Sequence, residues 1–151
     1  RSCRPQAEHL TRTMHHTLHI PAQFSQLAAA RRFVEETGAL LGLPRSVTEP
    51  LALAVDESLS NVVQHGYHDT VGMVEIEMER RADAVVVRLR DQGPPFDPTS
   101  LPDPDITLPL NQRPVGGLGV YLTRRSVDSV AYERTAAGDN QLTLTKKVAA
   151  A

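Results

Sequence analysis

The first patterned stretch of the chain predicts a short strand followed by a helix. Residues 1–13 are polar and without periodicity, so we expect a flexible N-terminal arm ahead of a strand near Thr17–Ile20. Pro21 can open a helix, and apolar residues then recur at helical spacing until Gly42 and Pro44 end the segment. The apolar stripe of this helix is Leu27, Ala30, Val34 and Leu41, widened by Phe33 and Leu40.

A second helix is predicted to follow directly. Its start has two candidate caps, because Ser46 and Glu49 are spaced as a capping box while Pro50 favours Thr48 instead. Gly66 marks the end of its apolar pattern. The residues expected to face the core are Leu51, Val55, Leu59 and Val62.

Two adjacent runs then change from helical spacing to strict alternation, which is typical of half-buried strands. Apolar residues at 74, 76 and 78 alternate with glutamates at 75, 77 and 79, and a second alternating run covers 85–90. Since only residues 80–83 separate the runs, they predict an antiparallel hairpin. Pairing of the glutamates with Arg88 and Arg90 on its outer face would contribute about 0.2–1 kcal/mol per pair.

The last third of the chain combines a loop, a short helix and a second hairpin. Residues 92–114 are rich in proline, which excludes a helix or central strand there. Such a long loop inside a compact domain is usually functional or mobile. A helix from about 115 to 125 should follow, and 126–134 should pair with 141–148 across a turn containing Gly138.

The order of these elements predicts an α+β fold. A strand, two helices, a hairpin, a loop, a helix and a hairpin suit a two-layer sandwich, with helices on one face of a mixed β-sheet. We expect one domain over residues 14–148 and a tail at 149–151, since 151 residues fit a single core.

Composition excludes several classes of protein. Lys and Arg total 16 against 18 Asp and Glu, and a net charge of −2 argues against a general binder of nucleic acid or membrane surfaces. Cys3 is the single cysteine, which excludes an internal disulfide and fits a reducing compartment such as the cytoplasm. Histidines at 9, 15, 16 and 19 match no metal-ligand spacing. A chain that begins with Arg1 suits a piece of a longer protein.

Glu57 and Asn61 are the first candidates for chemistry. They lie four residues apart on the second predicted helix and share one face, whereas Val55 and Leu59 each lie about 200° around from Glu57. A carboxylate can accept a proton, and an amide oxygen can bind a hard cation such as Mg²⁺. The alternative is an ordinary solvated helix face, which is the commoner meaning of such a pair.

Asp91 and Gly93 follow a strongly patterned strand. An aspartate at the end of a strand can accept a hydrogen bond from an exocyclic amine, and a glycine lets the backbone approach a planar ligand closely. The same residue types also fit a plain turn. For these two residues alone, the plain turn is the better interpretation.

Glycines at 116, 117 and 119 open a helix after the long loop. Backbone N–H groups and the helix dipole at such a position suit a phosphate, although glycine-rich helix entries also occur without a ligand. No Gly-Lys-Ser/Thr follows, which excludes a P-loop NTPase, and the chain has no lysine before Lys146, which excludes an ordinary protein kinase. A dinucleotide-binding Rossmann fold is excluded because these glycines follow a loop rather than the first strand.

Taken together and in this order, the three segments resemble the ATPase superfamily of gyrase, histidine kinases and mismatch-repair ATPases. Within it they look most like the bacterial anti-sigma-factor serine/threonine-protein kinases, and the resemblance covers roughly residues 17–148. Their fold, the Bergerat ATP-binding fold, has the element order predicted above. The segments that carry the resemblance are 57–66, 91–98 and 116–122.

The resemblance implies an ATP- and Mg²⁺-dependent serine kinase with a role for each segment. Glu57 would be the general base that takes the proton of the serine hydroxyl. Asn61 would ligate the Mg²⁺ that bridges the ATP phosphates. Asp91 would bind the adenine amine, with Gly93 and Phe96 beside the base.

The resemblance also implies a lid and a phosphate site. Residues 97–115 would cover the nucleotide, and Arg113 would reach the γ-phosphate from this lid, with a solvated loop arginine as the alternative. Relatives often carry a threonine at the start of the last strand that supports the adenine aspartate; Asn140 and Gln141 stand there instead, and Thr143 comes later. The residues implied to hold phosphates through backbone N–H groups are Gly116, Gly117, Leu118 and Gly119.

Partners follow from the same resemblance. The acceptor would be a serine on an anti-anti-sigma antagonist, whose release would let the kinase bind and sequester a sigma factor. Homodimers are common among relatives, and no direct contact with nucleic acid or membrane is expected. Two alternatives stay open: a nucleotide-gated binding module without significant turnover, and the catalytic ATP-binding domain of a larger signalling protein, such as a histidine kinase.

Overall fold

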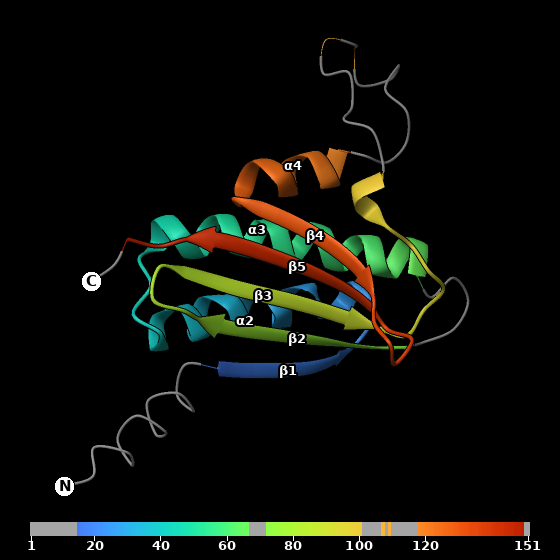
Figure 1. The fold of residues 1–151 in the computed structure, drawn as a ribbon, viewed down its shortest axis with the longest axis horizontal. Helices are drawn as coiled ribbons and strands as arrows, with labels where there is room; N and C mark the ends of the chain where they lie inside the picture. Colours follow the sequence, from blue (N-terminus) through green and yellow to red (C-terminus); the bar gives the residue numbers. More distant parts are fainter. Residues whose placement is uncertain (1–14, 67–71, 101–106, 108, 110–117, 150–151) are drawn as a thin grey trace, which may run out of the picture.

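The computed structural model describes residues 15–66, 72–100, 107, 109 and 118–149 (Figure 1). The predicted arm over 1–13 lies outside them, as do most of the predicted lid and tail. None of the described helices has the length and apolar character that crossing a bilayer requires. The elements in chain order are β1 (His15–Pro21), η1 (Phe24–Gln26), α2 (Leu27–Leu40), α3 (Arg45–Asn61), η2 (Val62–Gly66), β2 (Met73–Arg80), β3 (Ala84–Asp91), η3 (Pro98–Ser100), α4 (Leu118–Ser126), β4 (Ser129–Arg134) and β5 (Asn140–Lys147).

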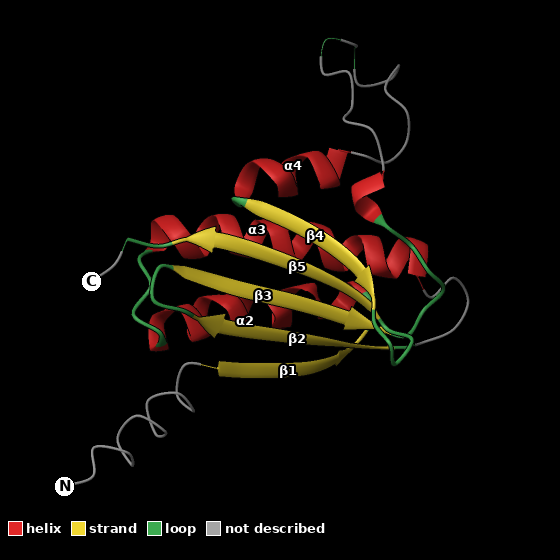
Figure 2. Cartoon of the chain, in the orientation of Figure 1, coloured by secondary structure: helices red, strands yellow, loops and turns green. Residues whose placement is uncertain are grey.

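The strands form one sheet in the order β1-β2-β3-β5-β4, with α2 and α3 covering one face (Figure 2). The predicted α+β sandwich is confirmed, but the sheet is antiparallel throughout, so the prediction of a mixed sheet is wrong. β3 and β4 run in the same direction, because each is antiparallel to β5. No parallel pair forms because β5 lies between them and is antiparallel to both.

The first strand extends to Pro21, and the first helix starts later than predicted. Pro21 pairs with Met73 as the last residue of β1 instead of opening a helix, and α2 begins at Leu27 after the η1 turn. α2 and α3 then run in opposite directions and return the chain to the end of the sheet where β1 finishes (Figure 1). β2 therefore starts beside Pro21 and runs antiparallel to β1.

α3 begins at Arg45 without a side-chain cap, so the two caps predicted for it, Ser46 and Thr48, are both wrong. Glu49, the expected partner of Ser46, instead binds Arg45, with 2.7 Å between Oε1 and Nη2. Thr48 is buried against α2, where a Cβ on Gly38 would lie 2.2 Å from its Cγ2. Gly38 therefore permits the close packing of the two helices, and Thr48 serves that contact rather than a cap.

The predicted apolar stripes meet in one core between the helices and the sheet, except that Leu40 is 74% exposed and does not belong to it. Burying a side chain of this size contributes about 1.5–3 kcal/mol relative to leaving it exposed. The stripe of α3 therefore fixes the rotation of this helix about its axis. Fully buried residues of α3 and β2 are Leu51, Val55, Leu59, Val74, Ile76 and Met78.

The opposite face of the sheet, which we call the open face, carries the charged pairs predicted for the hairpin. Arg88 Nη1 lies 2.6 Å from Glu77 Oε1, and Arg90 Nη1 lies 3.1 Å from Glu77 Oε2. Burial alone would raise the pKa of the Glu77 carboxyl, but hydrogen bonds from Arg90, His15 and Arg88 outweigh it and lower the pKa to about 2. Glu77 therefore remains ionised between its arginine partners.

Hydrogen bonds cross the whole open face in one row, which we call the open-face ladder. Arg90 donates to Glu75 Oε1 and Gln141 Oε1, at 2.7 Å in each case. His19 contacts Glu75 at 2.9 Å, and Gln141 donates to Glu133 at 2.9 Å. The ladder thus links side chains of all five strands, in the order His19, Glu75, Arg90, Gln141 and Glu133.

Candidate functional site

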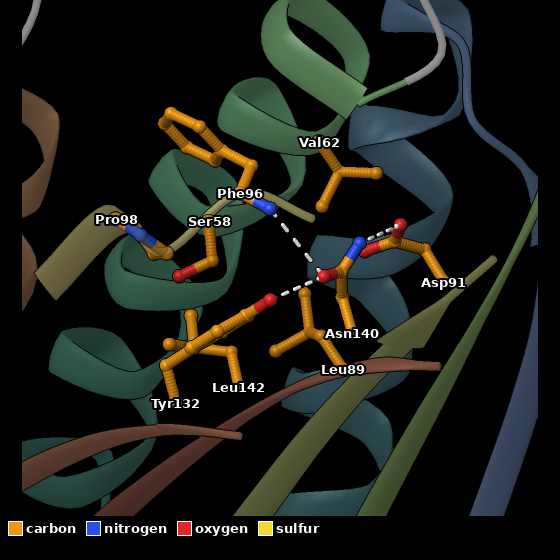
Figure 3. Close-up of a pocket in the computed structure, with 9 residues that line it drawn as sticks. All are labelled: Ser58, Val62, Leu89, Asp91, Phe96, Pro98, Tyr132, Asn140 and Leu142. Carbon is orange, nitrogen blue, oxygen red and sulfur yellow. Dashed lines mark hydrogen bonds between the residues drawn. The ribbon is translucent and has the colours of Figure 1, made fainter. Parts of the chain in front are cut away.

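A pocket lies at one end of the sheet, between α3 and the strands, and about 390 Å³ there is free of protein atoms, part of it open solvent (Figure 3). At this end β3 finishes with Asp91 and β5 begins with Asn140, and the two residues are directly paired. Segments distant in sequence therefore build one site. The pocket is also lined by Ser58, Val62, Phe96 and Tyr132.

Asp91 is the buried carboxylate of this pocket, with 6% of its surface exposed. Its Oδ1 accepts two hydrogen bonds, from Gly93 N at 2.9 Å and from Asn140 Nδ2 at 3.0 Å. Within the described part of the chain, Oδ2 accepts no hydrogen bond. Asp91 lines the pocket, so Oδ2 is available there to a donor on a ligand.

Gly93 and Phe96 lie in the segment that follows Asp91, as the sequence pattern predicted. Gly93 is buried, and its carbonyl accepts a hydrogen bond from Arg134 Nη1 at 2.9 Å. The Phe96 ring lines the pocket and stacks on His65, with ring centroids 4.8 Å apart and planes inclined by 21°. Phe96 therefore connects the pocket wall to the turn that ends the α3 segment.

Glu57 and Asn61 lie on α3 and are both half-buried. Val55 and Leu59 are fully buried, which confirms the predicted orientation of the helix. Burial, and secondarily the neighbouring Asp56 charge, raises the pKa of the Glu57 carboxyl above its ordinary value. Two residues next to them line the pocket: Ser58, which follows Glu57 on α3, and Val62, which follows Asn61 at the start of η2.

The donor set near the pocket suits Mg²⁺ shared with a ligand rather than a metal centre made by protein alone. Among the described residues, no group of three or more His, Cys, Asp or Glu side chains could hold a metal ion. Mg²⁺ binds through few protein oxygens and otherwise keeps water or substrate phosphate oxygens. The Asn61 amide and the phosphates of a nucleotide would meet this requirement.

Two histidines of β1, His15 and His19, have partners on the open face, away from the pocket. His15 Nε2 lies 3.2 Å from Glu77 Oε2, and His19 Nε2 lies 2.9 Å from Glu75 Oε2. These contacts account for two of the four clustered histidines. His9 lies outside the described residues.

The start of the predicted lid forms the short η3 helix. Asp97 Oδ1 accepts a hydrogen bond from Thr99 N at 2.8 Å, and Arg124 of α4 donates to the Thr99 carbonyl. This bond ties the start of the lid to the helix that follows the glycines. Leu118 and Gly119 begin α4, whereas Arg113, Gly116, Gly117 and nearly all of the lid after residue 100 lie outside the described residues.

Asn140 supplies the support for Asp91 that the sequence left open. Thr143, the alternative considered, pairs with Arg88 on the open face and is therefore turned away from the pocket. Tyr132 and Arg134 of β4 were not predicted as site residues, although both bond to Asn140. The available signal for them was the predicted hairpin of the last two strands, in which Arg134 pairs directly with Asn140.

The family described as the histidine kinase-like ATPase domain matches residues 20–146. The chain belongs to this family. It is similar to the protein named serine-protein kinase RsbW of Bacillus cereus strain G9842, with 30% identity over 115 residues, covering 74% of this chain and 72% of that protein. The serine-protein kinase RsbW of Bacillus mycoides strain KBAB4 is 28% identical over 115 residues. The resemblance to the anti-sigma-factor serine kinases is thereby confirmed.

A solved structure agrees with the fold of this ATPase family. It is the crystal structure of the RsbU and RsbW domains of a Mycobacterium tuberculosis protein, with a TM-score of 0.61 and 20% identity. The match covers 89% of this chain and 34% of that one, so the chain corresponds to about a third of its length. At this identity the likeness speaks for the fold alone.

Proposed function

We propose that this chain is an ATP- and Mg²⁺-dependent serine kinase that acts as an anti-sigma regulatory factor. The observation that carries the proposal is Asp91, a buried carboxylate with one oxygen held by two donors and the other left for a ligand. The exocyclic amine of adenine is a donor of the required kind. Membership of the ATPase family supports nucleotide binding, and similarity to serine-protein kinases supports phosphoryl transfer.

In this proposal the adenine base occupies the pocket and donates its amine to Asp91. The Gly93 backbone and the Phe96 ring lie beside the base. The lid over 97–115 covers the nucleotide, and Arg113 in this lid binds the γ-phosphate. The phosphates are held by the backbone N–H groups of Gly116, Gly117, Leu118 and Gly119.

Glu57 takes the proton from the serine hydroxyl that attacks the γ-phosphate. Burial and the Asp56 charge raise its pKa, which makes the carboxylate a stronger proton acceptor than an exposed glutamate. A positioned base of this kind contributes roughly 10²–10⁴-fold to the rate. Otherwise the transfer depends mainly on placement and charge neutralisation.

Asn61 is the residue that would hold Mg²⁺, together with the phosphate oxygens. When bound, the ion supplies neutralisation of the charge on the transferred phosphoryl group. Asn61 follows Glu57 by one helical turn on α3. One rigid helix therefore carries both the proposed base and the proposed metal ligand.

The proposed acceptor is a serine on an anti-anti-sigma antagonist, and the proposed second partner is a sigma factor that the kinase sequesters. Both partners are inferred from the resemblance to anti-sigma-factor kinases, which the similarity to RsbW proteins supports. The kinase could act as a homodimer, as relatives do. Direct contact with nucleic acid or membrane is not part of the proposal.

The test combines nucleotide binding with transfer of radiolabelled phosphate from ATP to candidate antagonist domains. We expect Glu57→Gln to retain ATP affinity and to lose phosphoryl transfer by roughly 10²–10⁴-fold, because only proton acceptance is removed. Glu49→Gln is the matched control, since Glu49 lies on the same helix but binds exposed Arg45. Undiminished transfer by Glu57→Gln would remove Glu57 from the mechanism.

The same experiment separates the kinase from a nucleotide-gated binding module. The bond from Arg124 to the Thr99 carbonyl connects the start of the lid to α4, so ATP bound at the start of α4 could order the lid without turnover. Saturable ATP binding with no label on any antagonist domain would favour this second function. Absence of ATP binding would contradict both.

A further inference from the structure

We propose that Asn140 is the positioning residue through which the pocket selects an amino group over an oxo group at the 6-position of a purine. This inference rests on the proposed binding of ATP and deepens it. Asn140 would act through Asp91, by holding its carboxylate in one orientation. The residue is 5% exposed and begins β5, directly opposite Asp91.

The amide nitrogen of Asn140 faces only acceptors. Nδ2 lies 3.0 Å from Asp91 Oδ1, 3.2 Å from the Gly93 carbonyl and 2.9 Å from the Pro94 carbonyl. One side chain therefore holds both the carboxylate of Asp91 and the backbone of the segment after it. The two N–H groups of the amide are shared among these three acceptors.

The amide oxygen of Asn140 faces only donors (Figure 3). Oδ1 accepts hydrogen bonds from the Tyr132 hydroxyl, from Arg134 Nη1 at 3.1 Å and from Phe96 N at 3.4 Å. Exchange of the amide oxygen and nitrogen would set the amide N–H groups against Arg134 Nη1 and Phe96 N, which can only donate, and the amide oxygen against the three acceptors. The neighbours on both sides thus determine a single orientation of the amide.

This orientation fixes the acceptor that faces a ligand. Gly93 N and Asn140 Nδ2 both bind Oδ1 of Asp91, so the carboxylate cannot rotate without losing two hydrogen bonds. Oδ2 is left as an acceptor in a defined place. The amino group of adenine would donate to it, whereas the carbonyl oxygen of hypoxanthine would be repelled by it.

The Asn140 amide makes hydrogen bonds to more neighbours than a single hydroxyl could. A threonine hydroxyl has one proton and could bind either Asp91 or a backbone carbonyl, but not both. It would also be too short to accept hydrogen bonds from Tyr132 and Arg134 of the edge strand β4 at the same time. Asn140 therefore connects side chains of the edge strand β4 to Asp91, the residue proposed to recognise the base.

The test compares the dissociation constants of ATP and inosine triphosphate for the full chain and for Asn140→Ala. We expect the unchanged chain to bind ATP roughly 10–100-fold more tightly than inosine triphosphate. In Asn140→Ala we expect ATP affinity to fall about 10-fold or more and the ratio to fall below about 3, because Asp91 keeps only the hydrogen bond from Gly93 N and Oδ2 is no longer held in one place. A merely structural loosening would weaken both nucleotides alike and leave the ratio unchanged.

Two further variants make the outcome decisive. Gln141→Ala changes the next residue of β5, which serves the open-face ladder, and should leave the ratio unchanged while reducing stability. Tyr132→Phe removes one donor to Asn140 and leaves the amide in place. It therefore tests the role of Asn140 in the ratio if Asn140→Ala fails to fold. We expect Tyr132→Phe to lower the ratio about 2–5-fold.

The possible results separate this inference from the proposed function. No ATP binding by the unchanged chain would contradict the proposed function itself. Discrimination that survives unchanged in Asn140→Ala, or in Tyr132→Phe if the first variant does not fold, would overturn the role of Asn140 and leave ATP binding intact.

Discussion

The two faces of the sheet carry different polar networks, although the same strands supply the residues of both. Arg90 and Asp91 are neighbours on β3, and Gln141 and Asn140 are neighbours on β5. Arg90 and Gln141 point to the open face, where their hydrogen bonds continue through the ladder to both edge strands. Asp91 and Asn140 point to the pocket, where one carboxylate oxygen is left over.

The difference shows which polar networks complete the fold and which provide for a ligand. In the open-face ladder Glu75 and Glu133 bind donors of the chain and are also accessible to water, so this network needs no ligand. In the pocket, six neighbours satisfy Asn140, yet Asp91 Oδ2 has no donor among the described residues. An acceptor that faces a pocket in this way marks a candidate binding site.

Asp91→Asn should have the largest effect of the series, and it should change ATP binding in the pocket rather than the stability of the fold. Its Oδ1 can still accept from Gly93 and Asn140, but an amino group replaces Oδ2 and meets the adenine amine donor to donor. We expect ATP affinity to fall about 10–100-fold, while the free energy of unfolding changes by less than about 1 kcal/mol. Calorimetric titration and urea unfolding measure the two quantities. A loss of stability equal to the loss of binding energy would contradict a ligand-directed role.

Glu77→Gln is the corresponding change on the open face. Removing the charge between Arg88 and Arg90 should lower the free energy of unfolding by about 1–3 kcal/mol and leave ATP affinity unchanged. Glu79→Gln is the matched control, because Glu79 is more exposed, at 31% against 14% for Glu77. Equal losses in the two variants would show that the position of Glu77 confers no special stability.

Acid should remove the stabilisation that Glu77 gives to the open face, gradually between about pH 4.5 and pH 2. The pKa of Glu77 is lowered to about 2, so its stabilisation is complete above the pKa of an unfolded glutamate and is lost as pH falls toward 2. Glu57 acts in the opposite sense, because its raised pKa makes protonation favour the folded state. Urea unfolding between about pH 5 and pH 2 should show the stabilities of Glu77→Gln and the unchanged chain converging at low pH. Parallel curves would contradict the assignment.

His19→Gln should have the smallest effect of the series. The His19 side chain is 61% exposed at the end of the open-face ladder, so its contact with Glu75 is well solvated. We expect the free energy of unfolding to change by less than about 1 kcal/mol and ATP affinity to stay constant. A larger loss would mean that the ladder acts as one cooperative unit.

The elements of the fold followed well from local patterns, and the contacts between them followed less well. Alternation predicted β2 and β3 together with their Glu–Arg pairs, and helical spacing predicted the buried stripe of α3. The caps of α3 were wrong because Thr48 packs against Gly38, a contact between two helices. Parallel strands were expected because nothing in the sequence indicated that β5 would lie between β3 and β4.

By itself the sequence determined which residues share a face, including Glu57 with Asn61 and the glutamates with each other, since periodicity depends only on local geometry. Only the tertiary structure decided that Asn140 supports Asp91, because 49 residues separate them and strand register joins them. The order of the strands was settled in the same way. Local geometry can be read along the chain, whereas a hydrogen bond between distant residues exists only once the sheet has brought them together.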